Sequence, residues 1–167
     1  MIELLIVIAI IGALMAAVFV GLNPVQRLAQ TRDATRIQVV GQLGRALDAY
    51  AVNNNGNYVV ENATWITTLV TAGDITSIPS APTYSITGTS ACATNVQPAG
   101  GYCYDTTTPA TGGGPIIVYA RLEAASNTSK CTAPNVAFTA YSTADGRGGI
   151  VCAAAAGPGV GIQTFVN

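Results

Sequence analysis

Residues 2–22 read IELLIVIAIIGALMAAVFVGL, and this stretch decides the fold. Within it, Leu4–Leu22 is a run of nineteen residues without a charge. As an α-helix that run would extend about 28 Å, close to the thickness of a bilayer's hydrocarbon core. A cleavable secretory signal has a basic segment before a shorter apolar core, whereas only the acid Glu3 stands close to this run. A simple signal anchor leaves Glu3 unexplained. The pattern therefore favours a single membrane span that is retained in the protein.

The chain continues as a second helical segment. Asn23-Pro24 interrupts the apolar run, and we expect a kink or a short unwound stretch near Gly21–Pro24, because proline removes a backbone donor and crowds the preceding turn. Asn and Gly at 53–57 predict the end of the helix. Between these limits apolar residues recur largely at spacings of three and four, which predicts one buried face. They are Val25, Leu28, Ile37, Val40, Leu43, Leu47, Tyr50 and Ala51, with Arg27, Arg32, Arg36 and Arg45 between them and Asp33 and Asp48 as possible local partners.

Past residue 53 the composition changes to Asn, Thr, Ser, Gly and Pro. We predict a short helix near 63–72 and an extended loop through Ile78-Pro79 and Ala81-Pro82. Asp145-Gly146 is typical of a hairpin turn. The predicted class is α+β: a long N-terminal helix, apolar in its first half and amphipathic in its second, packed on an antiparallel sheet. We divide the chain into an anchor helix, 1–24, and a globular head, 25–167. The predicted strands are Tyr102–Thr106, Pro115–Leu122, Val136–Ser142, Gly149–Cys152 and Val160–Val166.

The four cysteines permit three pairings. Sequential pairing, Cys92–Cys103 and Cys131–Cys152, would stabilise the head by roughly 3 kcal/mol per bond in the chain-entropy model. The alternative is a zinc site with four thiolate ligands, but the paired C-x2-C spacing is absent.

Composition excludes several functions. Only 9% of the residues are charged, against roughly 25% in ordinary soluble domains, and the net charge is −1. The sequence has no basic stripe that would indicate nucleic-acid binding, and without histidine it can form neither a His-based triad nor a His-ligated zinc site. Glycines 112–114 lack the following Lys-Ser/Thr of a phosphate loop. Asp105, Glu123 and Asp145 are too scattered for an acid pair and are predicted to be solvated. We therefore expect no enzyme activity, cofactor or metal.

The first fourteen residues, MIELLIVIAIIGAL, resemble the N-terminal segment of type IV pilins and of the related pseudopilins of type II secretion. Glu3 and Gly12 match the glutamate and glycine of that family. Glu3 is the third residue here, whereas the family's mature chain has the glutamate fifth, and Pro24 lies about one helical turn beyond the commoner position. The resemblance implies processing by a prepilin peptidase and methylation of the terminal amine. It also implies that Cys131–Cys152 is the C-terminal disulfide of the pilin head.

The resemblance implies a structural function, that of a major pilin. Such a subunit is held in the inner membrane with its head outside, and the pilus assembly machinery then adds it to a homopolymer, an extracellular type IV pilus used for adhesion, motility or DNA uptake. In pilins the glutamate, here Glu3, pairs with the N-terminal amine of a neighbour. Gly12, Gly21 and Pro24 are the other expected assembly residues. The alternatives are a major pseudopilin, a minor tip pilin acting as an adhesin or DNA receptor, and a membrane-anchored secreted enzyme.

Overall fold

The computed structural model describes residues 2–80, 84–85 and 101–166, without the side chains of residues 19–22. It has the predicted α+β class, with helices at the N-terminal end and an antiparallel sheet after them. The sheet order is β1-β2-β3-β4-β5, and every neighbouring pair is antiparallel. In chain order the elements are α1 Ile2–Leu22, α2 Pro24–Asn53, α3 Trp65–Ala72, β1 Cys103–Thr108, β2 Gly113–Arg121, α4 Ala125–Thr128, β3 Val136–Ser142, β4 Arg147–Ala153 and β5 Phe165–Val166.

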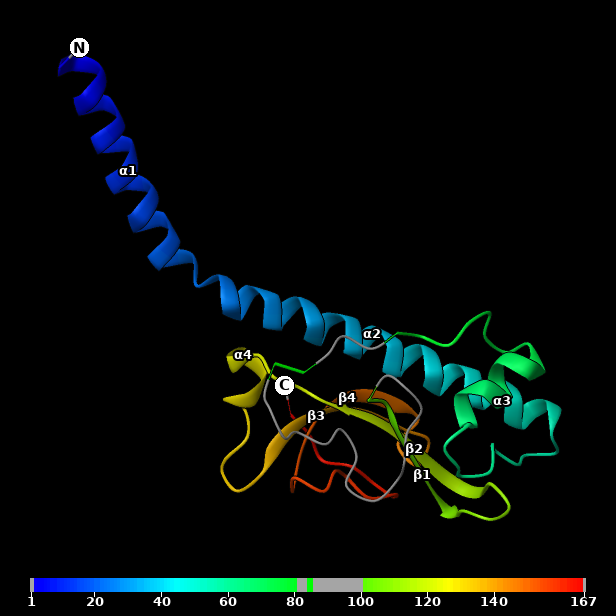
Figure 1. Ribbon diagram of the computed structural model, residues 1–167. Helices are drawn as coiled ribbons and strands as arrows, with labels where there is room; N and C mark the ends of the chain where they lie inside the picture. Colours follow the sequence, from blue (N-terminus) through cyan, green and yellow to red (C-terminus); the bar gives the residue numbers. More distant parts are fainter. Residues whose placement is uncertain (1, 81–83, 86–100, 167) are drawn as a thin grey trace.

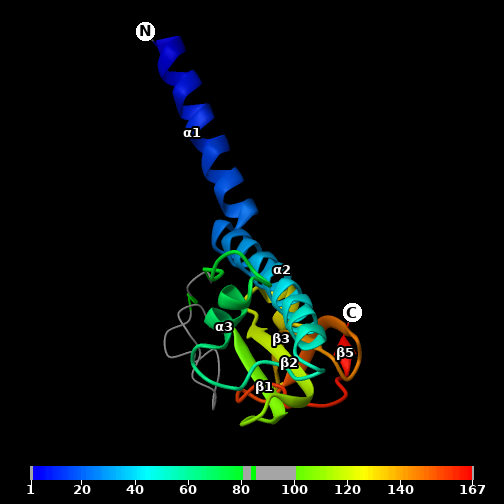
Figure 2. The same cartoon turned by 90° about the vertical axis from the view of Figure 1, so that its right-hand side faces the viewer.

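The helix α1 projects away from the head, and α2 lies across the sheet (Figure 1). The second view shows α3 on one side of α2 and the C-terminal β5 on the other (Figure 2). The two long helices are separated by Asn23 alone, which has φ 40° and ψ 73° in the left-handed region. Its side-chain oxygen accepts a hydrogen bond from the amide of Gln26 at 3.4 Å. The predicted interruption is thus present but shorter than expected, because Gly21 and Leu22 stay in α1 and Pro24 begins α2.

The core lies on both faces of the sheet, because side chains of a strand alternate between its faces. On one face Val118 of β2 packs in the cluster that contains Leu43 and Leu47 of α2. Trp65 of α3 belongs to the same cluster, where its ring stacks on that of Tyr104 at 5.0 Å between centroids. The opposite face is covered by the C-terminal segment, and its buried cluster is Cys103, Ile117, Tyr119, Phe138, Ala140 and Val151. The part of α2 from Val40 onward is therefore a core element, as the spacing of its apolar residues predicted.

Four predicted strands are present within a few residues of their expected limits, and β3 has the predicted bounds. The fifth is wrong over most of its length, because only Phe165–Val166 pairs with β4. Gly157 and Gly161 before it have φ of 103° and 127°, which strands do not use. The side-chain amide of Gln163 donates to the carbonyls of Gly159 and Gly161, which closes a compact loop there. The helix α4 was not predicted, and the predicted loop at Ala81-Pro82 lies outside the described residues.

The close approach of α2 to β3 depends on Gly44. The ring of Tyr141 lies directly on the backbone of this glycine, so that a Cβ atom there would overlap the ring. The Tyr141 hydroxyl reaches one turn further along α2 and donates to Asp48, which also accepts the hydroxyl of Tyr58 at 3.3 Å. The absence of a side chain at Gly44 thus leaves room for the Tyr141 ring against α2.

We predict that Gly44→Ala lowers the free energy of unfolding by about 1–3 kcal/mol, because Tyr141 must shift and its bond to Asp48 is strained. The matched control is Gly41→Ala, one turn earlier, where the new Cβ would meet only an Arg45 nitrogen at 3.9 Å. That variant should gain about 0.5–1 kcal/mol, since alanine is the better helix former. Urea titrations followed by circular dichroism measure both. Changes of the same sign in the two variants would contradict the prediction.

Candidate assembly surface

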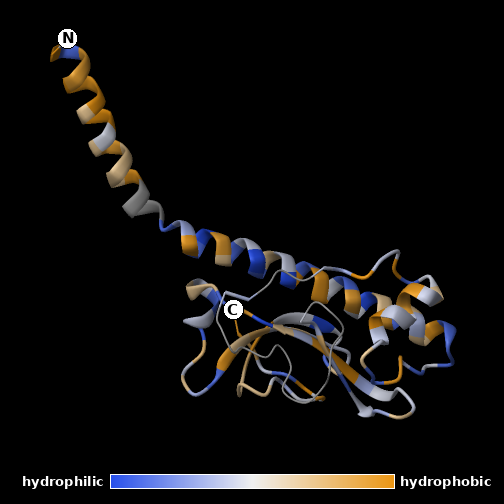
Figure 3. Ribbon diagram, viewed as in Figure 1, coloured by the Kyte–Doolittle hydropathy of each residue, from blue (hydrophilic) through white to orange (hydrophobic). Residues whose placement is uncertain are grey.

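The helix α1 presents an uncovered apolar surface. Every side chain from Ile2 to Val18 is exposed, and the large apolar ones have exposed fractions between 46% and 76%. Apolar residues occur on all sides of the helix, as the colouring by hydropathy shows (Figure 3). Apolar surface of this extent on a folded chain marks a site of interaction with another molecule or a membrane. Over the residues whose side chains the structure describes, which in α1 end at Val18, no helix is both long and apolar enough to cross a membrane.

The predicted assembly residues are distributed along this surface. Glu3 lies exposed in the first turn of α1. A Cβ added to Gly12 would meet nothing within 4 Å, so packing within the chain does not require glycine there. Nine residues make two and a half helical turns, so Glu3 and Gly12 lie on opposite faces. Gly21 and Pro24 flank the break at Asn23. The structure does not gather these residues into a pocket.

The first half of α2, residues 24–37, contacts the rest of the head through a face that is mostly polar. Here the prediction of an apolar buried face is wrong. Val25, Leu28 and Ile37, predicted on the buried face, have exposed fractions of 65%, 60% and 40%. The buried positions are instead Ala29, Asp33 and Arg36, with exposed fractions of 4%, 1% and 0%. Their spacing of four and three continues into Val40, where the apolar core begins. One face of α2 is therefore polar near the break and apolar further down.

Asp33 is the centre of this polar contact. Its carboxylate accepts hydrogen bonds from the backbone amides of Glu123, at 3.0 and 3.1 Å, and Ala124, at 2.9 Å. The Asn127 side chain donates to it at 2.8 Å, and the Arg36 guanidinium pairs with it at 3.1 Å. Ala124 is the N-cap residue of α4 and has no side chain that could cap this helix. Asp33 therefore holds the residues that lead into α4 against α2, across 90 residues of sequence.

Glu123 completes the cluster, although it was predicted to be solvated. Its side chain is 2% exposed and binds the Arg32 guanidinium through two bonds of 3.2 Å. It also accepts the Ser85 amide at 2.8 Å and lies 3.6 Å from Arg36. The Tyr84 ring stacks on the Arg36 guanidinium at 3.9 Å. No local pattern in the sequence marks Glu123 as buried, because Arg32, which it binds, is 91 residues away along the chain.

The electrostatics of Glu123 follow from these contacts. Burial by itself would raise the pKa of the carboxyl group. The Ser85 amide and the charges of Arg36 and Arg32 outweigh it, so that the pKa lies below its usual 4.5. The carboxylate is therefore ionised in the folded head at neutral pH.

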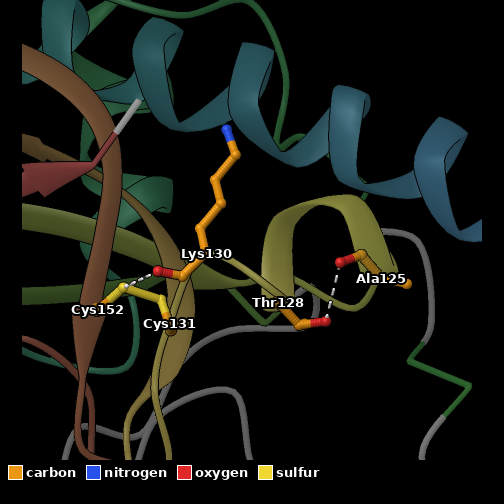
Figure 4. The surroundings of a disulfide bond; sticks show 5 residues. All are labelled: Ala125, Thr128, Lys130, Cys131 and Cys152. Atoms are coloured by element: carbon orange, nitrogen blue, oxygen red, sulfur yellow. Dashed lines mark hydrogen bonds between the residues drawn. A yellow bond between two sulfur atoms is a disulfide. The ribbon is translucent and has the colours of Figure 1, made fainter.

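A disulfide joins the chain just after α4 to strand β4. Cys131 follows this helix and is bonded to Cys152 of β4, with 5.4 Å between the Cα atoms (Figure 4). This pairing is the predicted one. Cys103 is also disulfide-bonded, and its predicted partner Cys92 lies outside the described residues. Cysteines in disulfides cannot supply zinc thiolates, which overturns the alternative of a four-cysteine zinc site.

The arrangement offers apolar contact along α1, one carboxylate near its start and a head fixed to α2 by ion pairs. No family model matches this chain, and no curated protein or solved structure matches it. The function is therefore argued from the geometry and from the N-terminal motif.

We predict that Asp33→Asn lowers the free energy of unfolding by about 3–5 kcal/mol, because it removes the nearest carboxylate from the buried Arg36 guanidinium and turns an amide group toward backbone donors. Asp74→Asn is the matched control, since this carboxylate is only partly buried, and it should change stability by less than about 0.5 kcal/mol. Urea unfolding measures both. Equal urea midpoints for Asp33→Asn and Asp74→Asn would show that Asp33 does not hold α2 on the head.

The lowered pKa of Glu123 predicts how stability depends on pH. A carboxyl group whose pKa is lower in the folded state stabilises fully above its unfolded pKa, near 4.5, and loses that contribution as the pH falls through the folded value. The stability difference between the wild type and Glu123→Gln should therefore be largest near neutral pH and shrink in acid. Thermal unfolding between pH 3 and pH 7 tests this. A difference that does not change with pH would contradict it.

Proposed function

We propose that this chain is the structural subunit of a type IV pilus and polymerises through α1. The observation that carries the proposal is that α1 exposes apolar side chains on every side while the head is a closed unit with its own core. A surface that surrounds a helix suits a bundle, in which several neighbours contact one helix at once. The N-terminal motif with Glu3 and Gly12, which resembles that of the pilin family, supports the same proposal.

In this proposal the uncharged run Leu4–Leu22 holds the subunit in the inner membrane before assembly. Processing by a prepilin peptidase and extraction by the assembly machinery then transfer α1 into the filament core. Transfer from lipid to a protein core yields little hydrophobic free energy, because lipid tails are as apolar as leucine. Close packing and polar pairing must therefore supply the driving force.

Glu3 is the group that supplies polar pairing on α1. A carboxylate within apolar surroundings costs up to about 2.5–3.5 kcal/mol at a helix centre and less toward the end. A cation on a neighbouring subunit removes that cost, and in pilins this cation is the N-terminal amine. Because only one position along the neighbour satisfies Glu3, the pair would set the axial register of the filament.

The deciding experiment is negative-stain imaging of filaments sheared from the cell surface, with mass spectrometry of their main protein band. Micrometre-long filaments composed of this chain would support the major pilin. Filaments in which the chain is only a trace component would indicate a minor pilin. Short filaments that form only on overexpression together with a secretion system would indicate a pseudopilin.

We predict that Glu3→Gln abolishes incorporation into filaments while the subunit still folds, because the amide keeps the shape and removes the charge. Glu3→Asp is the matched control and should keep measurable assembly, since it keeps the carboxylate. Filament yield is measured at equal subunit levels, with unfolding of the head as the check on folding. Normal filament yield from Glu3→Gln would refute the role of the charge.

A further inference from the structure

The chain contains two tripeptides of the form Asn-x-Ser/Thr, the acceptor motif for N-linked sugar. They are Asn62-Ala63-Thr64, just before α3, and Asn127-Thr128-Ser129, which overlaps the end of α4. A motif this short often occurs by chance, and the sequence alone does not separate the two. The structure separates them, because the surroundings of the reacting atom, the asparagine side-chain nitrogen Nδ2, differ between the two sites.

Asn62 is exposed, and its side chain forms a tight turn with Thr64. Its Oδ1 atom accepts a hydrogen bond from the Thr64 amide at 2.8 Å and another from the Thr64 hydroxyl at 2.9 Å. These bonds hold the carboxamide by its oxygen, and among the described residues no hydrogen bond engages its nitrogen. The hydroxyl that the motif requires therefore lies against the carboxamide, while Nδ2 of this exposed residue remains available.

The turn is held in place on both sides. Before it, the amide of Glu61 donates to the carbonyl of Pro109 at 3.0 Å. After it, the carbonyl of Thr64 accepts the amide of Thr68 in α3, also at 3.0 Å. A glycosyltransferase would therefore meet the acceptor already arranged, without the entropic cost of ordering a loop. The helix α3 packs beside the second half of α2 and away from α1 (Figure 1), so a sugar just before α3 leaves the apolar surface of α1 uncovered.

The second motif belongs to a contact within the protein. Nδ2 of Asn127 donates to the carboxylate of Asp33 in α2 at 2.8 Å. Ser129 follows in right-handed helical backbone, so its side chain points about 200° away from that of Asn127 around the helix axis. The hydroxyl of this motif is therefore turned away from the carboxamide, and the nitrogen helps to hold α2 on the head.

We propose that Asn62 is an acceptor for N-linked sugar and that Asn127 is not. This inference goes beyond the proposed function and requires only that the head lies outside the membrane. The Cys131–Cys152 disulfide supports that location, because disulfides form and persist in oxidising compartments. The donor that suits this location is a saccharide carried on a polyprenyl diphosphate, a lipid of the membrane itself.

The transfer is balanced and needs no oxidant or reductant. Nδ2 of Asn62 attacks the anomeric carbon of the first sugar, and a C–N bond forms while the bond from that carbon to the phosphate oxygen breaks. The polyprenyl diphosphate leaves as an anion. A base of the transferase takes one proton from the amide nitrogen, which keeps the second of its two hydrogens.

The test is glycopeptide mass spectrometry of the full chain isolated from the cells that produce it, with fragmentation that leaves the sugar on its residue. The matched variants Thr64→Ala and Ser129→Ala delete one hydroxyl from each motif and keep both asparagines. We expect sugar on Asn62 in the wild type and in Ser129→Ala, and at least a tenfold loss of it in Thr64→Ala. Thr64→Ser keeps the hydroxyl and should restore attachment, which separates loss of the motif from loss of the fold.

Several results would overturn the inference. They are a wild-type chain without sugar on Asn62, sugar on Asn127, sugar on serine or threonine only, and full attachment in Thr64→Ala. The wild-type measurement decides even where a variant is not produced. Filament formation does not enter the test, so sugar on Asn62 of a chain that forms no filaments supports this inference while the proposed function fails. Filaments of unmodified subunits show the reverse.

Discussion

Near the break at Asn23, the attachment of α2 to the rest of the head depends on one buried carboxylate, that of Asp33. Near the break α2 offers the head no large apolar side chain, so directional bonds replace the hydrophobic effect there. A buried ion pair adds little net stability compared with apolar packing, but breaking one is costly, because it leaves a charge buried without a partner. A rotation of α2 by one residue, about 100°, would take Asp33 away from the amides of Glu123 and Ala124. The contact therefore fixes which side of α2 faces the head and which side remains free.

The same constraint determines where α1 points. Because α2 cannot rotate about its own axis on the head, the left-handed backbone of Asn23 sets the direction in which α1 leaves the head. Asparagine is one of the few residues besides glycine that adopt this conformation at low cost, and Pro24 suits the first position of a helix, where no amide donor is needed. Asn23 and Pro24 thus divide a continuous apolar-to-amphipathic pattern into two helices, the exposed α1 and the packed α2.

Much of this architecture could be predicted from local patterns. The uncharged run, the Asn-rich end of α2 and the limits of β3 follow from residues close together in the sequence, whereas Cys131–Cys152 is one of the pairings that four cysteines permit and the one that the resemblance implies. The polar contact could not, because Asp33 and Glu123 are 90 residues apart and neither has a local pattern that marks burial. Periodicity assigned Val25 and Leu28 to the core because it cannot show where along the helix the head ends. On the assembly surface, exposure of α1 was predictable, whereas the exposure of Val25 and Leu28 past the break was not.

The exchange of polar and apolar positions on the first half of α2 also bears on which contacts the proposed filament subunit can make. If the face toward the head were apolar there, α1 of another chain could compete with the head for it, since α1 is apolar on all sides. In the structure Asp33 on that face accepts hydrogen bonds from backbone amides and from the Asn127 side chain. Arg32, on the same helix, pairs with the Glu123 carboxylate. The helix α1 has one acid and no free donors in its interior turns, so it cannot replace these partners. Specificity arises from rejecting the wrong contact as well as from favouring the right one. The apolar side chains displaced from that face, Val25 and Leu28, remain on the exposed side of α2.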